Sequence, residues 1–432
     1  MESPEAEQRG ALAWWIDIPL YLRIIGGLIL GIILGLTLKA HPTVAGVSSD
    51  KILNGFGAIT GLILKLLGAL APPLILVAVL DTLIKARLQG GVARRMIWLL
   101  VTNTLAAILI GLITANVVQP GHRAKLDVAH DGAAMMPHGN PWEALLGNVP
   151  DSLLRPLVDN NVIGVILIGA AFGIALRRLD GDDRRIAEQM VGVAFRAIAI
   201  VLHWIIELVP LGVFGIIARV VGTSGFAPFY ALGWFVLAVV LGLLLQLAFY
   251  LTRVRVSSWV SPLKLLSGMR DAIVMAFSTD SSTATMPVTY RCLRDNVGLR
   301  DESARMGALV GTNFNNDGTA LYEAMSALFV AQLIPIHLSF AQQLMVVLTS
   351  IVASVGAAGI PEAGLVTMTL VFSAVGLPKE YIAMLLTVDW FLDRCRTVIN
   401  MMGDTCVACL LDGKQQAIES ERAMVAEVVA VV

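Results

Sequence analysis

Long apolar stretches recur along the chain, and they constrain its fold more than any other feature. We count eight stretches near the length of about 20 residues that an α-helix needs to cross a membrane. They lie at residues 18–38, 52–84, 96–118, 162–176, 191–221, 229–251, 304–334 and 381–411. Of the 432 residues, 57% are hydrophobic and 15% are charged, whereas soluble domains carry about 25% charged residues. The sequence therefore predicts an all-α integral membrane protein.

Two further apolar segments, 261–293 and 341–377, do not have the pattern of spans. Each has a small, polar centre with a proline, which reads STDSSTATMP at 278–287 and SVGAAGIP at 354–361. The arms on either side hold only about 12–15 residues, too few to cross a bilayer, so each segment predicts a hairpin that enters the membrane and returns. Non-helical backbone at that depth must be covered by protein or a watery cavity. A pair of such hairpins predicts inverted repeats around a central site.

Basic residues predict the orientation of the chain. They gather between the second and third spans, between the fourth and fifth, and after the sixth. These residues are Lys85, Arg87, Arg94, Arg95, Arg177, Arg178, Arg184, Arg185, Arg253, Arg255, Lys264 and Arg270. By the positive-inside rule we expect both termini in the cytoplasm, the hairpin at 261–293 open to the inside and the one at 341–377 open to the outside.

The last predicted span carries an unusual number of charged and polar groups on one side. At 100° per residue, five of them fall within a stripe of about 80°, with Thr397 beside it. They are Asp389, Asp393, Arg396, Asn400 and Asp404. Charges at this depth must face a cavity and find partners. Arg396 can grip a carboxylate with two hydrogen bonds and Asp393 can bind an ammonium group, which together predict an acidic amino acid as ligand. A structural ion-pair network is the alternative.

The seventh predicted span contains GTNFNNDGTALYE at 311–323. The polar run Asn315 to Gly318 predicts an unwound stretch, whose carbonyl groups and Asp317 carboxylate are oxygen donors suited to a small cation. A simple kink at Gly318 is the alternative. Six residues on, Glu323 lies in apolar surroundings and is a candidate proton carrier, or else a hydrogen-bonded structural residue.

Hydroxyl groups gather at the tip of the first hairpin, at Ser281, Ser282 and Thr283. Exposed amides and hydroxyls at the N-terminus of a half-helix can hold a carboxylate. We therefore predict that Ser281 and Ser282 contribute to substrate binding.

These motifs, in this order, resemble those of the glutamate/aspartate transporters, the dicarboxylate/amino acid:cation symporters, and in some stretches the animal excitatory amino-acid transporters. The stretches are SSTATMP at 281–287, DGTALYE at 317–323, GAAGIP at 356–361 and VDWFLDRCRTVINMMGD at 388–404. The resemblance covers most of residues 15–412. It implies eight transmembrane helices, two re-entrant hairpins arranged as inverted repeats, a homotrimer and an elevator-type movement.

The resemblance also implies a division of each protomer into two domains. A scaffold domain would comprise residues 15–95 and 142–222. A mobile transport domain would comprise 96–120 and 228–412, and residues 413–432 would form a cytoplasmic tail. The loop at 121–141 is expected on the outside.

The family pattern implies specific ligand contacts. The substrate pocket would comprise Ser282, Thr319, Asp393, Arg396, Thr397 and Asn400, with backbone contacts from Ile360 and Gly364. One sodium site would comprise Gly311, Asn315, Asn400 and Asp404. A second would comprise Asp317, Asn315 and Thr104, with Asn103 and Ser354 as further candidates.

The chain departs from that pattern around the cations, since Leu100, Asn103, Asn313 and Asn316 stand where other residues are usual. We also expect Asp280 and Arg394, an unusual combination, to pair across the site. The main interpretation is a secondary active symporter of aspartate or glutamate in the cell membrane, the inner or plasma membrane, driven by sodium. A proton-coupled or exchange-only carrier and, in another class, an anion channel are the alternatives. We find no nucleophile–base pair among these polar groups, so the sequence does not suggest an enzyme.

Overall fold

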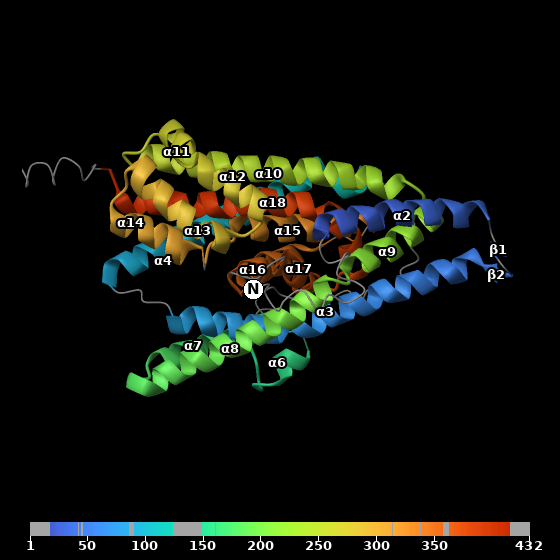
Figure 1. The fold of residues 1–432 in the computed structure, drawn as a ribbon, viewed down its shortest axis with the longest axis horizontal. Helices are drawn as coiled ribbons and strands as arrows, with labels where there is room; N and C mark the ends of the chain where they lie inside the picture. The colour runs from blue at the N-terminus through green and yellow to red at the C-terminus, as the bar shows by residue number, and fades with distance from the viewer. Residues whose placement is uncertain are drawn as a thin grey trace, which may run out of the picture.

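The computed structural model is almost entirely helical, and most of its long helices run along one axis (Figure 1). It describes residues 18–41, 43–44, 46–85, 90–123, 149–159, 161–312, 314–334, 336, 338–356 and 363–414. Within these ranges, one element departs from the predicted all-α class. It is an antiparallel pair of two-residue strands, β1 (Thr43–Val44) and β2 (Val47–Ser48).

One group of helices is built around α3, which contacts α7, α8 and α9, while α2 lies along α9. The members are α2 (Leu20–Ala40), α3 (Ser49–Lys85), α6 (Arg155–Val158), α7 (Val162–Arg177), α8 (Gly181–Ile206) and α9 (Val209–Ser224). The approach of α2 to α9 is close because α2 presents glycine at 27, 31 and 35. A Cβ atom added at any of the three would lie 2.6–2.8 Å from a carbonyl oxygen of α9.

The apolar run predicted at 191–221 contains two helices. α8 ends at Ile206 and α9 begins at Val209. Pro210 lacks the amide hydrogen that would continue the helix, and its ring clashes with the carbonyl group four residues earlier. At the break, Glu207 forms an ion pair with the buried Arg23 of α2.

A second group of helices surrounds α18, which contacts α10 and α15, while α4 packs against α10 and α15. The members are α4 (Gly90–Val118), η2 (Pro120–Arg123), α10 (Ala227–Ser257), α15 (Asp317–Leu333) and α18 (Glu380–Asp412). Residues 317–331 of α15 are all buried, so this helix forms the centre of the group.

Both predicted hairpins contain two helical arms. In the first, α11 (Pro262–Gly268) and α12 (Arg270–Thr279) form one arm. The other arm is α13 (Ser282–Arg291), followed by a π-helical turn, η3 (Cys292–Val297). Its tip is Asp280, which has a left-handed backbone with φ of 54°. The second consists of α16 (Phe340–Gly356) and α17 (Ala363–Ala374), and its tip, with Ile360, lies outside the described residues. The return of either hairpin within a membrane stays a prediction.

The seventh predicted span is interrupted, as its polar run predicts. It begins with α14 (Asp301–Arg305) and a π-helical turn, η4 (Met306–Gly311), and the next helix starts only at Asp317. The interruption therefore precedes Asp317 and Gly318, which form the first turn of α15 and not part of the unwound stretch.

Five helical runs among the described residues are long and apolar enough to cross a membrane. They are Leu22–Ala40, Ser49–Lys85, Arg94–Arg123, Gly181–Thr223 and Pro228–Ser257. Large apolar side chains such as Leu30, Leu62, Trp98 and Leu237 are exposed on their outer faces, as expected of surfaces that face lipid. The remaining predicted spans are shorter, broken or rich in polar residues, so the count of eight stays a prediction.

Candidate functional site

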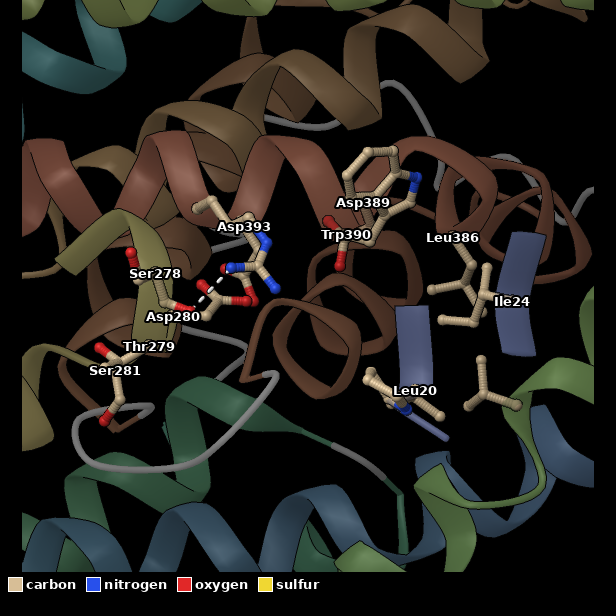
Figure 2. A pocket seen from close by; sticks show the side chains of 13 residues that line it. Leu20, Ile24, Ser278, Thr279, Asp280, Ser281, Leu386, Asp389, Trp390 and Asp393 are labelled. Atoms are coloured by element: carbon tan, nitrogen blue, oxygen red, sulfur yellow. Dashed lines mark hydrogen bonds between the residues drawn. The ribbon is translucent and has the colours of Figure 1, made fainter. Parts of the chain in front are cut away.

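A cavity of about 560 Å³ lies between α2 and α9 of the first group and the hairpin tip and α18 of the second (Figure 2). Three carboxyl groups line it, those of Asp280, Asp389 and Asp393. Figure 2 shows Asp280 and Asp393 facing one another, with Ser281 on the tip beside them. The apolar side of the cavity comes from Leu20 and Ile24 of α2 and from Leu386 and Trp390 of α18.

Arg396 is fully buried behind this wall of carboxyl groups. Its Nε atom donates to Asp393 Oδ1 at 3.1 Å, and its Nη2 atom also contacts that oxygen. Its Nη1 atom lies 3.1 Å from Asp389 Oδ1 and forms an ion pair with it without the geometry of a hydrogen bond. Arg396 Nη1 and Asp389 Oδ1 are both buried and have no hydrogen-bond partner. The guanidinium group also lies 4.1 Å from the centre of the Tyr322 ring, which favours a cation.

Gly364 at the start of α17 gives this guanidinium group its space. A Cβ atom there would lie 2.8 Å from Arg396 Nη1 and 3.0 Å from Nη2. The two residues are far apart in sequence, and the second hairpin therefore closes directly over the arginine. The structure thus brings Gly364 and Arg396 together, as the resemblance implies.

The tip of the first hairpin is tied to α18 by side chains. The Thr397 hydroxyl donates to Asp280 Oδ1 at 3.0 Å. Arg394 donates to the carbonyl oxygens of Phe277 and Ser278, both at 2.9 Å. The expected Asp280–Arg394 ion pair is wrong, because no ion pair within 4.0 Å joins these two described residues. Arg394 reaches the last carbonyls of α12, where a helix end attracts positive charge.

The predicted serines occupy the start of α13. Ser281 caps this helix, its side chain accepting from the Ala284 amide at 3.1 Å, and it lines the cavity. Ser282 is the first helical residue. An α-helix N-terminus presents unpaired amides and attracts anions, so this tip has the features that the sequence predicts for a carboxylate contact.

Asn400 joins the middle of α18 to the start of α15. Its Oδ1 atom accepts from the Gly318 amide at 2.8 Å, and its Nδ2 atom donates to Asn316 and Thr319, each at 3.3 Å. The predicted substrate residues Thr319, Thr397 and Asn400 therefore lie on neighbouring turns of α15 and α18 around Arg396.

The first predicted cation set contains buried oxygen atoms with no partner. Asp404 Oδ2 accepts from Thr312 at 3.1 Å, but Asp404 Oδ1 and Asn315 Oδ1 have no hydrogen-bond partner. The Asn315 amide donates at 2.9 Å to the carbonyl oxygen of Asn400. Gly311 leaves room here, because a Cβ atom on it would lie 2.7 Å from Asp404 Oδ1. Carboxylate and amide oxygens are ligands that hard cations prefer, so this set fits a cation.

The second predicted set differs. Asp317 accepts from the Thr104 hydroxyl at 2.6 Å and from the Tyr250 hydroxyl at 2.5 Å. Asn103 Oδ1 accepts from Arg253. Tyr250 and Arg253 were not predicted as site residues, and Arg253 was assigned to a loop, whereas α10 continues to Ser257. Both the described Asp317 oxygens and the Asn103 amide oxygen already accept from a donor, in contrast to the unpartnered oxygens of the first set. The side chain of Ser354, like Asn313, lies outside the described residues.

Glu323 is fully buried one turn after Thr319 in α15. Neither of its carboxyl oxygens has a hydrogen-bond partner, and neither has the nearby Ser350 hydroxyl. A buried carboxyl group without partners is costly when charged, which is consistent with the predicted exchange of a proton.

Comparison with known proteins agrees with this geometry. The sequence profile of the sodium:dicarboxylate symporter family matches residues 20–414. Excitatory amino acid transporter 3 of Mus musculus is 28% identical over 451 residues, which cover 89% of this chain and 83% of that protein. An excitatory amino acid transporter of Caenorhabditis elegans is 38% identical over 254 residues, or 56% of this chain and 49% of that protein. The chain thus spans about half the length of the second relative, and 46% of excitatory amino acid transporter 4 of Mus musculus, at 36% identity.

Proposed function

Because the chain belongs to the sodium:dicarboxylate symporter family of membrane transporters, we propose that it is a secondary active symporter that carries aspartate or glutamate together with sodium. The observation that carries the proposal is Arg396. It is a fully buried guanidinium group behind a cavity of about 560 Å³, and one of its nitrogen atoms has no hydrogen-bond partner. Arg396 already faces the carboxylates of Asp389 and Asp393, and a substrate carboxylate would supply the hydrogen-bond acceptor that its free nitrogen atom lacks.

The three polar groups of an acidic amino acid match three parts of the site. The side-chain carboxylate would bind Arg396, displacing Asp393 from it. Asp393 would then be available for the substrate ammonium group, as the stripe on α18 predicts. The α-carboxylate would bind the amides and hydroxyls of Ser281 and Ser282, with Thr319, Thr397 and Asn400 completing the polar wall. The backbone of Ile360 and Gly364 would cover the substrate from the second hairpin.

Asp404, Asn315, Gly311 and Asn400 are the residues that would hold sodium. Their two unpartnered buried oxygens support this assignment. A bound cation there would supply positive charge that offsets the anionic substrate in a low-dielectric interior. The coupling follows because each ligand then raises the affinity for the other.

The two groups of helices support an elevator movement. The scaffold domain, at 15–95 and 142–222, would stay fixed within a homotrimer. The transport domain, at 96–120 and 228–412, would carry the site across the membrane. The cavity is lined from both groups, as expected of a site that changes its walls when one group slides along the other. By the distribution of basic residues, both termini would be cytoplasmic.

Uptake into proteoliposomes tests the proposal, with radiolabelled aspartate outside and sodium and proton gradients imposed separately. We expect uptake driven by an inward sodium gradient. Arg396→Cys should abolish aspartate binding and leave room for a neutral amino acid, while Arg255→Gln, an exposed arginine on α10, should behave as the parent. Unchanged aspartate affinity in Arg396→Cys would show that the assignment is wrong.

A proton-coupled carrier is the second candidate, and Glu323 favours it. Both of its oxygens are buried without a hydrogen-bond partner. Uptake driven by a proton gradient in the absence of sodium, and lost in Glu323→Gln, would establish this alternative over the first.

A further inference from the structure

We propose that Arg253 is a built-in cation beside Asp317, so that this chain binds one sodium ion fewer than its buried acidic residues would otherwise require. The inference rests on the proposed function, because it concerns how many ions accompany the substrate.

The surroundings of Asp317 are those of a carboxylate already held by hydrogen-bond donors. The hydroxyl groups of Thr104 and Tyr250 donate to its two oxygens at 2.6 and 2.5 Å. Both hydroxyls are fixed on other helices, α4 and α10, and Tyr250 is fully buried. Each donor uses one lone pair of a carboxylate oxygen, so these bonds stabilise the charge of Asp317 in the absence of a metal ion.

Arg253 supplies a positive charge at this place. Its Nη1 atom donates to the Oδ1 atom of Asn103, the neighbour of Thr104 on α4, and it lies close enough to interact electrostatically with Asp317. Its guanidinium group also lies 5.5 Å from the centre of the Phe249 ring. The amide oxygen of Asn103, a further candidate ligand for sodium, thus already accepts from the arginine.

The position of Arg253 follows from a polar stripe on α10. Gln246, Tyr250 and Arg253 are spaced by four and three residues and so share one face of the helix. Gln246 donates to the Asn103 carbonyl oxygen at 3.2 Å. Gln246 and Arg253 thus contact Asn103 of α4, Tyr250 between them contacts Asp317 of α15, and α10 presents Arg253 to the site as part of that face.

Asp404 has the opposite surroundings. It is 1% exposed, one of its oxygens has no hydrogen-bond partner, and the neighbouring Asn315 oxygen has none either. Two buried acids in one region of a membrane protein each need a compensating positive charge. Among the described residues neither acid has an ion pair within 4.0 Å, but Arg253 interacts electrostatically with Asp317, whereas the charged group that acts on Asp404 is the negative Asp317 itself. The geometry therefore assigns the mobile cation to Asp404.

The number of sodium ions that bind with aspartate can be measured from equilibrium binding of radiolabelled aspartate to the purified protein. Sodium is varied and choline keeps the ionic strength constant. The slope of log affinity against log sodium concentration, below saturation, gives the number of sodium ions taken up with each aspartate, because linkage is reciprocal. We expect a slope of about one for the parent chain and, since Asp404 carries the ion, little sodium dependence in Asp404→Asn.

Two variants test the role of Arg253 itself. Arg253→Gln removes the built-in charge, so Asp317 needs an ion and the slope should rise toward about two. Asp317→Asn should leave the slope unchanged. Arg255→Gln is the matched control, since this arginine is exposed two residues along the same helix. The sodium-dependent rise in melting temperature, measured without substrate, provides a readout independent of aspartate binding.

The outcomes separate the two proposals. A parent slope of two or more that falls by one in Asp317→Asn would overturn the role of Arg253 and leave the symporter proposal intact. A parent that binds aspartate with no sodium dependence, or does not bind it at all, would overturn the proposed function and this inference with it. If Arg253→Gln does not fold, the parent and Asp317→Asn still decide the question.

Discussion

Thr397 on α18 donates a 3.0 Å hydrogen bond to Asp280, the left-handed residue at the tip of the first hairpin. Because Asp280 lines the cavity, this bond connects the position of the tip to the residues that surround Arg396.

Removal of this bond should loosen the hairpin tip. A hydrogen bond contributes about 0.5–1.5 kcal/mol, so Thr397→Val should weaken aspartate binding by up to roughly tenfold. In a chain with its four cysteines replaced by serine, a cysteine introduced at Ser278 should react faster with a polar thiol reagent when Thr397 is valine. An unchanged reaction rate would show that the bond does not hold the tip closed.

Arg394 should act through the backbone of α12 and independently of Asp280. It donates to the Phe277 and Ser278 carbonyl oxygens, so Arg394→Gln should lower stability by about 1–3 kcal/mol, and Arg394→Lys by less. The double variant with Asp280→Asn should show nearly additive losses in a double-mutant cycle, with a coupling under about 0.5 kcal/mol. A double variant that loses clearly less stability than the sum of the two single variants would instead support the Asp280–Arg394 ion pair that the sequence predicts.

A side chain at Gly364 should displace the buried guanidinium group. The added methyl carbon would lie 2.8 Å from Arg396 Nη1, and the close-packed interior leaves little room for adjustment. We expect Gly364→Ala to lower aspartate affinity about tenfold or more, by analogy with overpacking costs of about 1–3 kcal/mol. Gly233→Ala on α10, where a Cβ atom would meet nothing within 4 Å, is the control and should bind aspartate normally.

Asp412 should make stability sensitive to acid. Burial opposes its ionisation, but hydrogen bonds from Trp259 and Arg300 outweigh this and hold the pKa of Asp412 below its usual value. A carboxyl group with a depressed folded-state pKa stabilises the protein above its unfolded-state pKa, of about 3.9, and the stabilisation is lost as pH falls through the folded-state pKa. The melting temperature should therefore fall as the pH is lowered below about 4. Asp412→Asn should have a lower melting temperature at neutral pH and a weaker acid dependence.

Periodicity within one helix predicted the most about this protein. The stripe on α18 could be derived because Asp389, Asp393 and Arg396 belong to a single element with a known repeat. The interruption before Asp317 was also predictable, since three consecutive polar residues rarely continue a buried helix.

Contacts between helices could not be predicted in the same way. The donors to Asp317 come from α4 and α10, and Arg253 was expected in a loop because its charge resembles a membrane-flanking residue. The spacing of Gln246, Tyr250 and Arg253 places them on one face of a helix, which the sequence alone could show. Only the packing of α10 against α4 shows that this face lies beside Asn103 and Asp317. For the same reason, Arg394 was paired with the wrong group.

The cavity that Asp280 and Asp389 share with Leu20 and Ile24 has a consequence for inhibitors. One of its walls belongs to α2 and the opposite wall to the hairpin and α18. A compound that carries an acidic amino acid head and a bulky apolar tail would bind through the head and place its tail against α2. The tail would then act as a wedge between two surfaces that would slide past one another in the proposed elevator movement. Such a compound would compete with the substrate for binding, yet it would not be carried across the membrane.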